Sequence, residues 1–333
     1  MHDVLSAVAS LASWRTLAII LALVNLKNLP FGWHLRVLYH FLRNLRFKPN
    51  DPFFPKGKAI IDSHGQPTHP IFVPCSVMSR TPLLETDYNL HKSNSTYFSD
   101  LDIARTALVT RIYSPGAGIV SKELDQEFRE ASKKEGKKAP RSKPIMVVLG
   151  SVYCTFKREI KPFELYEMQS KIISWDKKWL YIQTTFLRPA KKTGGEKTLL
   201  AIGLSKYVVK KGRLTVSPER ILRAGGFLPE RPAETAAADS STSVSGVGTP
   251  ASGEGIAASG ALDGSLAREV LKISEKQLPD REALEREKKT NSDSWNVEEW
   301  TWERIEQERL RGLHVVEPYI NMDVQLEHEV HGK

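Results

Sequence analysis

The residues best suited to chemistry lie between Asp87 and Tyr97, where the chain reads Asp-Tyr-Asn-Leu-His-Lys-Ser-Asn-Ser-Thr-Tyr. A carboxylate precedes a histidine by four residues, and the polar run that follows offers side chains suited to cap a helix. A carboxylate near a helix N-terminus lies beside free backbone N–H groups. This pairing suits acyl transfer, because an oxyanion must be stabilised while a base or nucleophile acts. An Asp and a His at such a junction also form ordinary turns and caps, and that interpretation stays open.

A helix and a run of strands must position this motif. Apolar residues from Tyr97 to Ile112 recur every three or four positions, which predicts a helix over about 93–113. The charged stretch 121–144 indicates a solvated helix and loop. Alternating and β-branched segments predict strands over 73–85, 145–160, 165–175, 179–187 and 199–209, with a short final segment over 215–222. A long central helix wrapped by antiparallel strands is an α+β architecture, assigned here to residues 71–223.

The N-terminal residues 1–48 predict membrane association. Val4–Leu26 is apolar except for a few polar residues and Arg15, and its uninterrupted part is shorter than the roughly 20 residues that span a bilayer. Trp33–Phe47 carries a leucine stripe opposite basic residues, as an interfacial helix does. The cations follow the apolar run, which would leave the main domain facing the cytosol. Packing of both segments against the globular domain is the alternative.

Three further segments complete the organisation. Residues 49–70 are rich in Pro and Gly and indicate a connection. Residues 224–265 are dominated by Gly, Ala, Ser and Thr and predict a disordered linker. Residues 266–333 predict a charged helical extension. Its part from Trp295 to Tyr319 is expected to fold back on the core, because exposed tryptophans are costly.

Composition narrows the functional classes. The chain has 333 residues, 41% of them hydrophobic and 26% charged, with a net charge of +9. The basic excess suggests an anionic partner, but no nucleic-acid-binding module is visible, so we expect no nucleic acid. Cys75 and Cys154 match neither a disulfide framework nor a metal-ligand spacing, and buried free thiols in a reducing compartment are expected. We expect no metal and no cofactor.

The motif and its setting resemble a hotdog-fold thioesterase of the 4-hydroxybenzoyl-CoA thioesterase-like branch. The resemblance covers roughly residues 71–222 and is closest to membrane-anchored and fungal polyketide-pathway thioesterase-like proteins. The residues that carry it, followed by the strand series, are Asp87, His91, Asn94, Tyr97, Asp100, Asp102 and Arg105.

The resemblance implies an acyl-thioesterase that hydrolyses an acyl-CoA or a carrier-bound acyl or polyketide thioester, in secondary metabolite biosynthesis. It implies Asp87 as nucleophile or general base. Backbone N–H groups near Ser93–Ser95 would hold the thioester oxygen. The residues assigned to substrate binding or loop shaping are His91, Ser93, Asn94, Ser95 and Tyr97. A homodimer is also implied.

Two departures favour an alternative function. The family's common glycine is Leu90 here, and the first asparagine of its pair is Ser93. A Cβ at position 90 obstructs close approach of the backbone to a ligand, a role in which glycine is preferred. The alternative is a catalytically inactive hotdog protein that binds acyl chains or acts as a scaffold.

Overall fold

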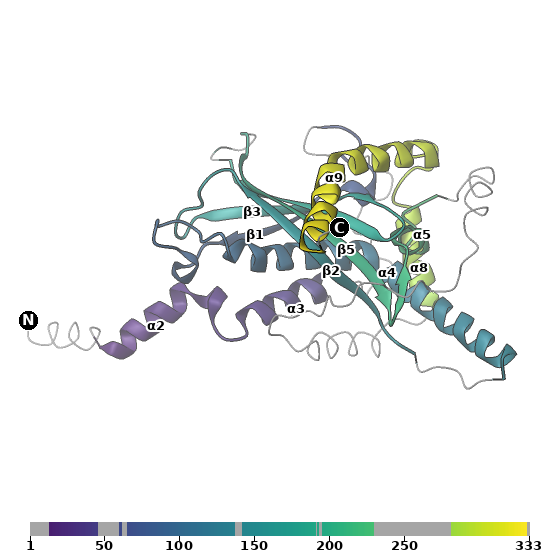
Figure 1. The fold of residues 1–333 in the computed structure, drawn as a ribbon. Helices are drawn as coiled ribbons and strands as arrows, with labels where there is room; N and C mark the ends of the chain where they lie inside the picture. Colours follow the sequence, from purple (N-terminus) through teal and green to yellow (C-terminus); the bar gives the residue numbers. More distant parts are fainter. Residues whose placement is uncertain are drawn as a thin grey trace, which may run out of the picture.

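One long helix, α4 (Thr96–Lys134), lies against a curved antiparallel sheet in the computed structural model (Figure 1). The structure describes residues 13–45, 60–61, 65–136, 142–190, 192, 195–229 and 281–331. This arrangement confirms the predicted α+β hotdog architecture. Most of the predicted linker, the first residues of the chain and much of the 49–70 connection lie outside the described residues.

The sheet has six strands in the order β1-β3-β4-β5-β2, with β6 paired to β5. All pairs are antiparallel, and β-bulges interrupt the register of β2–β5, β3–β4 and β4–β5. Such bulges increase local twist and help a sheet curve around a helix. The strands are β1 (Cys75–Arg80), β2 (Ile145–Phe156), β3 (Leu165–Trp175), β4 (Trp179–Arg188), β5 (Thr198–Lys211) and β6 (Leu214–Val216).

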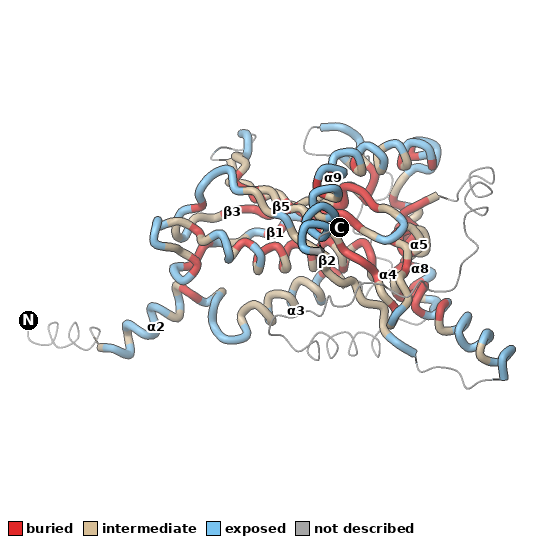
Figure 2. Tube along the Cα trace, viewed as in Figure 1, coloured by how far each residue is buried: buried red, intermediate tan, exposed pale blue. Residues whose placement is uncertain are grey.

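The core lies between α4 and the sheet. Leu101, Ala104 and Leu108 on the helix are fully buried, as are Met168 and Phe186 on the facing strands. These helix positions follow the three-and-four spacing seen in the sequence, so that spacing correctly identified the buried face. Figure 2 shows this buried layer continuing along α4 beneath the strands.

The predicted end of the central helix near residue 113 is wrong, because α4 continues to Lys134. Pro115 lacks the N–H that a continuing helix uses, yet it lies inside the helix. Packing against another helix compensates for the hydrogen bond that Pro115 cannot make. The short helix α5 (Pro218–Ala224) comes so close that a Cβ on Gly116 would lie 1.9 Å from the carbonyl oxygen of Ile221. The predicted solvated helix over 121–144 is therefore partly an extension of α4.

The C-terminal helices α8 (Arg281–Ser292) and α9 (Trp302–His331) pack on the domain. Trp300 belongs to the main core, and Trp295 packs against it. The centroid of the His69 ring lies 4.7 Å from that of Trp295 and 5.6 Å from that of Trp300. At Gly312, an added Cβ would lie only 1.8 Å from a β3 carbonyl, so α9 sits directly on the sheet. The expected folding back of this segment is confirmed.

The N-terminal segment consists of α2 (Trp14–Val24), the 3-10 turn η1 (Leu26–Asn28) and α3 (Gly32–Asn44). α3 runs beside α4, whereas α2 extends away from the domain (Figure 1). Two shorter 3-10 turns, η2 (Pro70–Phe72) and η3 (Leu83–Glu85), flank β1. Among the helices in the described part of the chain, none combines the length and hydropathy needed to cross a bilayer.

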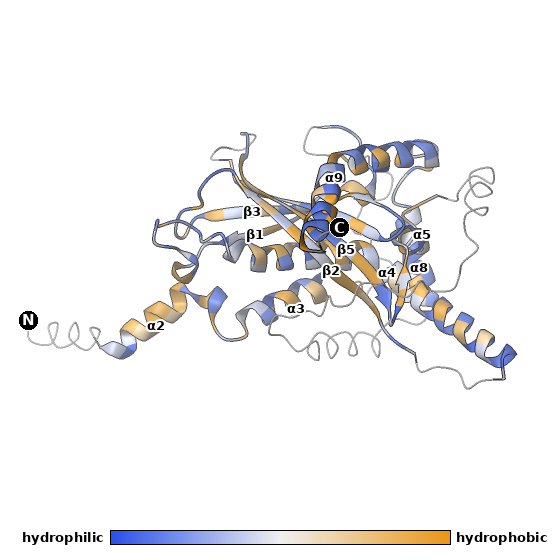
Figure 3. Cartoon of the chain, viewed as in Figure 1, coloured by the Kyte–Doolittle hydropathy of each residue, from blue (hydrophilic) through white to orange (hydrophobic). Residues whose placement is uncertain are grey.

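The orientation of α3 is the reverse of an ordinary surface helix. Its leucine stripe points outward, with Leu35 63% and Leu42 41% exposed. Its opposite side faces the domain, where Trp33 and Val37 pack against the core and Arg36 reaches a buried carboxylate. An amphipathic helix normally buries its apolar stripe. α2 likewise buries none of its residues and is strongly apolar (Figure 3).

Candidate active site

Asp87 lies in a tight loop between η3 and α4, called here the Asp87 loop (residues 86–95). The Asp87 N–H donates to the carbonyl of His91 at 2.9 Å, and the Leu90 N–H donates to the carbonyl of Asp87 at 3.0 Å. A β-bridge joins Thr86 to Lys92 across the base of the loop. The loop is therefore a closed, hydrogen-bonded turn, and Asp87 directly follows the first residue of the bridge that closes it.

The carboxylate of Asp87 and the imidazole of His91 are brought together, as the spacing indicated. Nδ1 of His91 lies 3.5 Å from Oδ2 of Asp87, and each side chain is about one quarter exposed, at 24% and 23%. The other carboxylate oxygen accepts the N–H of Asn89 at 2.9 Å. The pair thus shapes a turn and also presents a solvent-accessible carboxylate, so the two interpretations made from the sequence coexist at one position.

Leu90 adopts a left-handed conformation, with φ of +61°. Glycine adopts this region without strain, whereas a side-chain Cβ makes it costly. The resemblance places a glycine at this position, and the backbone angle gives the physical reason for it. Leu90 is 73% exposed, so its side chain projects outward and is not part of the core.

Ser93 to Thr96 form the approach to α4. The first helical residue is Thr96, and Ser95 at the N-cap has helical backbone angles and no side-chain capping bond. The Ser93 N–H donates to the carbonyl of Glu85 at 2.7 Å, so this amide is engaged inside the protein. The Ser93 amide is therefore not available to the thioester oxygen, and the expectation that amides near Ser93–Ser95 hold that oxygen stays a prediction for Asn94 and Ser95. Asn94 and Ser95 are exposed, and their amides have no acceptor within the described residues.

Tyr97 is a packing residue. Only 2% of it is exposed, and its ring lies 4.9 Å from the rings of both Phe156 and Phe186. The Nζ atom of Lys92 sits above the same ring, 5.3 Å from its centroid. Burial, with smaller effects from neighbouring groups, raises the pKa of the Tyr97 hydroxyl well above its ordinary value. Tyr97 therefore supports the Asp87 loop from below.

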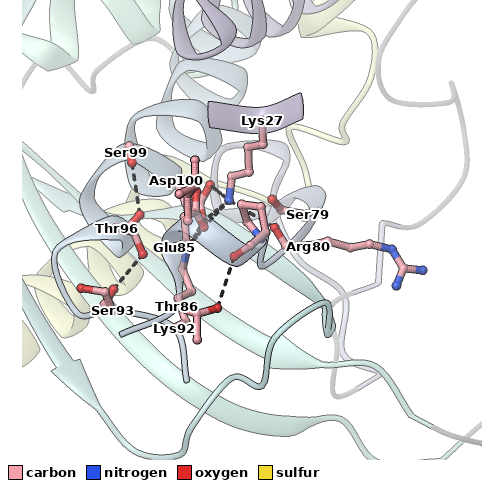
Figure 4. Close-up of polar contacts among 12 residues, drawn as sticks. Lys27, Ser79, Arg80, Glu85, Thr86, Lys92, Ser93, Thr96, Ser99 and Asp100 are labelled. Carbon is pink, nitrogen blue, oxygen red and sulfur yellow. Dashed lines mark hydrogen bonds and ion pairs between the residues drawn. The ribbon is translucent and has the colours of Figure 1, made fainter. Parts of the chain in front are cut away.

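A buried ion cluster, which the sequence did not reveal, fixes both ends of the loop. It consists of Lys27, Arg36, Glu85, Lys92 and Asp100. Figure 4 shows four of these residues, Lys27, Glu85, Lys92 and Asp100, gathered at one place. Asp100 is fully buried and Lys92 and Glu85 nearly so. Glu85 directly precedes the loop, Lys92 lies within it and Asp100 is in the second turn of α4. The loop is consequently anchored on both sides of Asp87.

The contacts within the cluster are direct. Nζ of Lys27 lies 2.9 Å from Glu85 and 2.8 Å from Asp100, and Nζ of Lys92 lies 3.0 Å from Asp100. Lys92 also binds Glu85, and Arg36 approaches Asp100 to 3.2 Å. Each of the two buried carboxylates is thus paired with at least two of the three cations, as low-dielectric burial requires.

Tyr166 on β3 completes the hydrogen bonding of the cluster. Its hydroxyl donates to Asp100 and accepts from Lys27 at 3.0 Å. Burial alone would raise the pKa of Asp100, but Lys27, Lys92 and Arg36 outweigh it and hold that pKa well below its usual range. Burial lowers the pKa of Lys27, against the attraction of Asp100. The cluster is a satisfied network that rigidifies the loop.

One sequence signal pointed to part of this cluster. Asp100 follows Tyr97 by three residues and adjoins Leu101, so a carboxylate falls on the apolar face of the central helix. A buried charge there requires partners. Lys27 gave no such signal, because its partners lie 53 to 139 residues further along the chain.

Asp102 and Arg105, which also carried the resemblance, form a second pair on α4. Arg105 is 1% exposed, binds Asp102, and donates to the Ser205 hydroxyl at 2.7 Å. Its guanidinium lies 5.6 Å from the centroid of the Tyr207 ring. Burial raises the pKa of Asp102, with Arg105 opposing that effect. The pair connects α4 to β5, away from the Asp87 loop.

Comparisons with known proteins agree with this architecture. Residues 81–224 match the thioesterase-like superfamily. The chain is 34% identical over 332 residues to a thioesterase, lcsJ, from Purpureocillium lilacinum, covering 95% of this chain and 92% of that protein. It is 35% identical over 223 residues to a probable thioesterase, atnL, from Emericella nidulans, covering 62% and 69% of the two chains.

Among solved structures, the YbaW probable thioesterase from Escherichia coli aligns with 44% of this chain and 92% of its own, at 14% identity and a TM-score of 0.32. The family match and the similarity to the Purpureocillium lilacinum thioesterase establish the class of protein. This chain belongs to the thioesterase-like superfamily of hotdog proteins.

Proposed function

We propose that the protein hydrolyses an acyl thioester with Asp87 as nucleophile or general base. The observation that carries the proposal is a solvent-accessible carboxylate on a loop that the buried ion cluster holds on both sides. Preorganised groups are effective in catalysis because they need not reorganise during the reaction. The exposed amides of Asn94 and Ser95, which precede α4, are the donors assigned to the thioester oxygen.

Two routes are open to this carboxylate. As a base, Asp87 takes a proton from water while the water oxygen bonds to the thioester carbonyl carbon. The C–S bond then breaks, and the thiolate leaves with that proton, giving a carboxylic acid and a thiol. As a nucleophile, Asp87 attacks the carbonyl carbon and expels the thiolate, and water hydrolyses the resulting anhydride. His91, within 3.5 Å, orients the carboxylate in either route.

The substrate class proposed is an acyl-CoA or a carrier-bound acyl or polyketide thioester in secondary metabolism. Support comes from the resemblance of the motif and from fungal relatives that are themselves named thioesterases. Both substrate types share the thioester and differ in the thiol carrier.

The experiment is release of free thiol from a panel of acyl-CoAs by the full chain and by Asp87→Asn. Asn keeps an oxygen for the Asn89 N–H, so the loop should stay closed. Removal of the base or nucleophile should slow turnover by about 10²–10⁴-fold. Tyr88→Phe is the matched control, because Tyr88 lies in the same loop and is 92% exposed. Equal turnover by wild type and Asp87→Asn would refute the proposed role.

The alternative function is a catalytically inactive acyl-binding or scaffold protein, and two observations favour it. Leu90 holds a glycine-type backbone conformation, and the Ser93 amide already binds Glu85. Under this alternative, the full chain binds a non-hydrolysable acyl-CoA analogue, and neither wild type nor Asp87→Asn releases thiol from any member of the panel.

We also propose that the outward faces of α2 and α3 lie on a membrane surface, with the main domain facing the cytosol. Six large apolar residues of α2 are between 44% and 75% exposed, and the leucine stripe of α3 continues this surface. Exposed apolar patches of this kind mark interaction sites. Residues 13–45 carry no acidic residue, and the two cations outside the buried ion cluster, Arg15 and Arg43, are exposed, which favours anionic lipid over a protein partner of mixed charge.

Sedimentation with anionic liposomes tests the membrane proposal. Replacing Leu35, Leu38 and Leu42 by Ser should lower the partition coefficient at least tenfold, because each lost leucine removes apolar burial. Leu310→Ser with Leu326→Ser on α9 is the matched control, since both leucines are exposed and lie on another helix. Equal losses in the two variants would contradict a specific lipid-facing surface, and binding to DNA at matched salt would favour nucleic acid instead.

A homodimer is proposed through the edge of the sheet. β2 pairs with β5 on one side, and no strand within the described residues pairs with its other side. A 12-residue edge strand offers backbone donors and acceptors to a second copy. Light scattering of the full chain tests this, and a monomer at micromolar concentration would contradict it.

A further inference from the structure

The structure contains a cavity that the proposed chemistry does not use. It has a volume of about 280 Å³ and lies between the end of α3, the middle of α4 and the start of β2. Phe41 and Leu45 form its α3 wall, and Val109 and Ala117 belong to its α4 wall. The lining is mostly apolar. Ligand sites in proteins commonly combine an apolar cavity with a few polar groups.

Tyr113 supplies a polar group at this cavity. Its side chain lines the cavity and is 2% exposed, yet its hydroxyl has no hydrogen-bond partner within the described residues. Nε of Arg105, another lining residue, is also buried without a partner. A buried donor without an acceptor costs free energy. Both donors belong to residues of the cavity lining, and a ligand oxygen brought to either of them would satisfy it.

The position of the cavity suits a chain that starts at the Asp87 loop. Arg105, the first α4 residue of the lining, lies nine residues beyond Thr96, and so about 14 Å along the helix axis. The lining then continues along α4 to Ser121. An elongated apolar molecule with its reacting end at the helix N-terminus would run in this direction.

We propose that this cavity binds an acyl chain that carries an oxygen substituent, a hydroxyl or keto group, along its length. The chain fills the apolar lining, and its oxygen accepts a hydrogen bond from the Tyr113 hydroxyl. The ligand is thus a functionalised acyl chain and not a plain hydrocarbon chain. The α3 wall belongs to the segment preceding the residues that match the superfamily, so this site is particular to proteins with such an N-terminal segment. The biological role of the site rests on the proposed thioester hydrolysis, but ligand binding does not.

The experiment is calorimetric binding of free acids, which contain no thioester. Dodecanoic acid is compared with a series of hydroxydodecanoic acids whose hydroxyl moves along the chain, using the full-length protein. At least one hydroxy acid should bind more tightly than dodecanoic acid by about 2–10-fold, the usual range for one neutral hydrogen bond. All of these ligands carry the same carboxylate, so its contribution to the binding free energy cancels when their affinities are compared.

Tyr113→Phe should abolish the preference and keep the affinity for dodecanoic acid. This variant removes only an unpartnered hydroxyl, so the fold should be at least as stable as the wild type, which a melting curve verifies. Ala117→Leu should fill the cavity and weaken both ligands at least tenfold. Leu310→Ser, on the exposed side of α9, is the control and should leave both affinities unchanged.

The inference is overturned if no hydroxy acid is preferred, if Tyr113→Phe keeps the preference, or if Ala117→Leu binds as the wild type does. These results are distinguishable from failure of the proposed hydrolysis. Loss of thiol release in Asp87→Asn with no chain preference would support the hydrolysis alone. A Tyr113-dependent preference without thiol release would support the acyl site alone.

Discussion

Lys27→Met tests whether the N-terminal segment is an integral part of the active-site framework. Methionine keeps the length and apolar stem of lysine while removing its charge. Lys27 is 12% exposed and contacts Glu85, Asp100 and the Tyr166 hydroxyl. Its loss therefore affects the two carboxylates that anchor the Asp87 loop.

The expected loss of stability depends on which ion pairs Glu85 and Asp100 keep in the variant. Removing one partner of a buried ion pair typically costs about 3–5 kcal/mol, because the other charge is left unpaired. Here Asp100 keeps Lys92 and Arg36, and Glu85 keeps Lys92. A hydrogen bond to a charged group is worth about 1.5–3 kcal/mol. We therefore expect the free energy of unfolding to fall by about 2–3 kcal/mol at pH 7.

The pH dependence provides a second, independent test. The pKa of Asp100 is depressed in the folded protein, so its contribution to stability is present above the unfolded pKa of about 3.9 and is lost as the pH falls through the folded pKa. Lys27→Met raises that folded pKa. Because the unfolded states are the same, the difference in unfolding free energy between wild type and variant should be full at pH 7 and shrink only as the pH falls through the folded pKa of Asp100 in the variant.

Urea denaturation followed by tryptophan fluorescence, from pH 7 to pH 3, measures both quantities. Arg43→Met is the matched control, because Arg43 is exposed and bonds only to the neighbouring Tyr39 hydroxyl among the contacts described. The control should change stability by less than about 0.5 kcal/mol. A Lys27→Met variant as stable as the control, or a stability difference that grows as the pH falls, would refute the role given to the cluster.

Three further predictions concern the loop, the C-terminal helix and a thiol. Leu90→Gly should relieve about 1–2 kcal/mol of left-handed strain against roughly 0.5–1 kcal/mol of added chain entropy, raising Tm by about 2 °C; Leu90→Ala should give no such gain, and a lower Tm for Leu90→Gly would contradict the reasoning. Gly312→Ala should cost about 3 kcal/mol and expose α9 to limited proteolysis, because its Cβ would lie 1.8 Å from the Ile173 carbonyl oxygen. Gly136→Ala, with open space around its Cβ, should cost only about 1 kcal/mol through its positive φ, and equal losses would count against the packing argument. Burial raises the pKa of the Cys154 thiol to about 11, so its alkylation at pH 8 should be at least about 100-fold slower than that of a free thiol, and an equal rate would be inconsistent with that burial.

The fold was predictable because its strands and helix have clear periodicity. The strand predicted over 165–175 has those same bounds in β3, since alternating apolar residues and a short turn define both ends. The length of α4 was not predictable from local pattern. Pro115 signals a helix end, and only the packing of α5 against Gly116, about a hundred residues later in sequence, explains why the helix continues.

The sequence allowed the carboxylate of the candidate site to be predicted, but not the buried ion cluster that holds its loop. Asp87 and His91 come together because four residues close one turn of chain. The buried ion cluster and Tyr166 together join three regions far apart in sequence, and no spacing rule connects Lys27 to Tyr166. The orientation of α3 was unpredictable for a related reason, because the burial of Arg36 depends on Asp100 being present on another helix.

The long reach of Lys27 also has a consequence for the order of events during synthesis. Tyr166 lies 139 residues after Lys27, and translation proceeds at roughly 5–20 residues per second. Lys27 therefore leaves the ribosome about 7–28 seconds before Tyr166, whose hydroxyl helps to fix it, leaves in turn. During that interval α2 and α3 have no core to pack on and expose their apolar faces. We expect the nascent chain to meet a lipid surface first and to complete its domain beside that surface, which fractionation of stalled ribosome complexes would reveal.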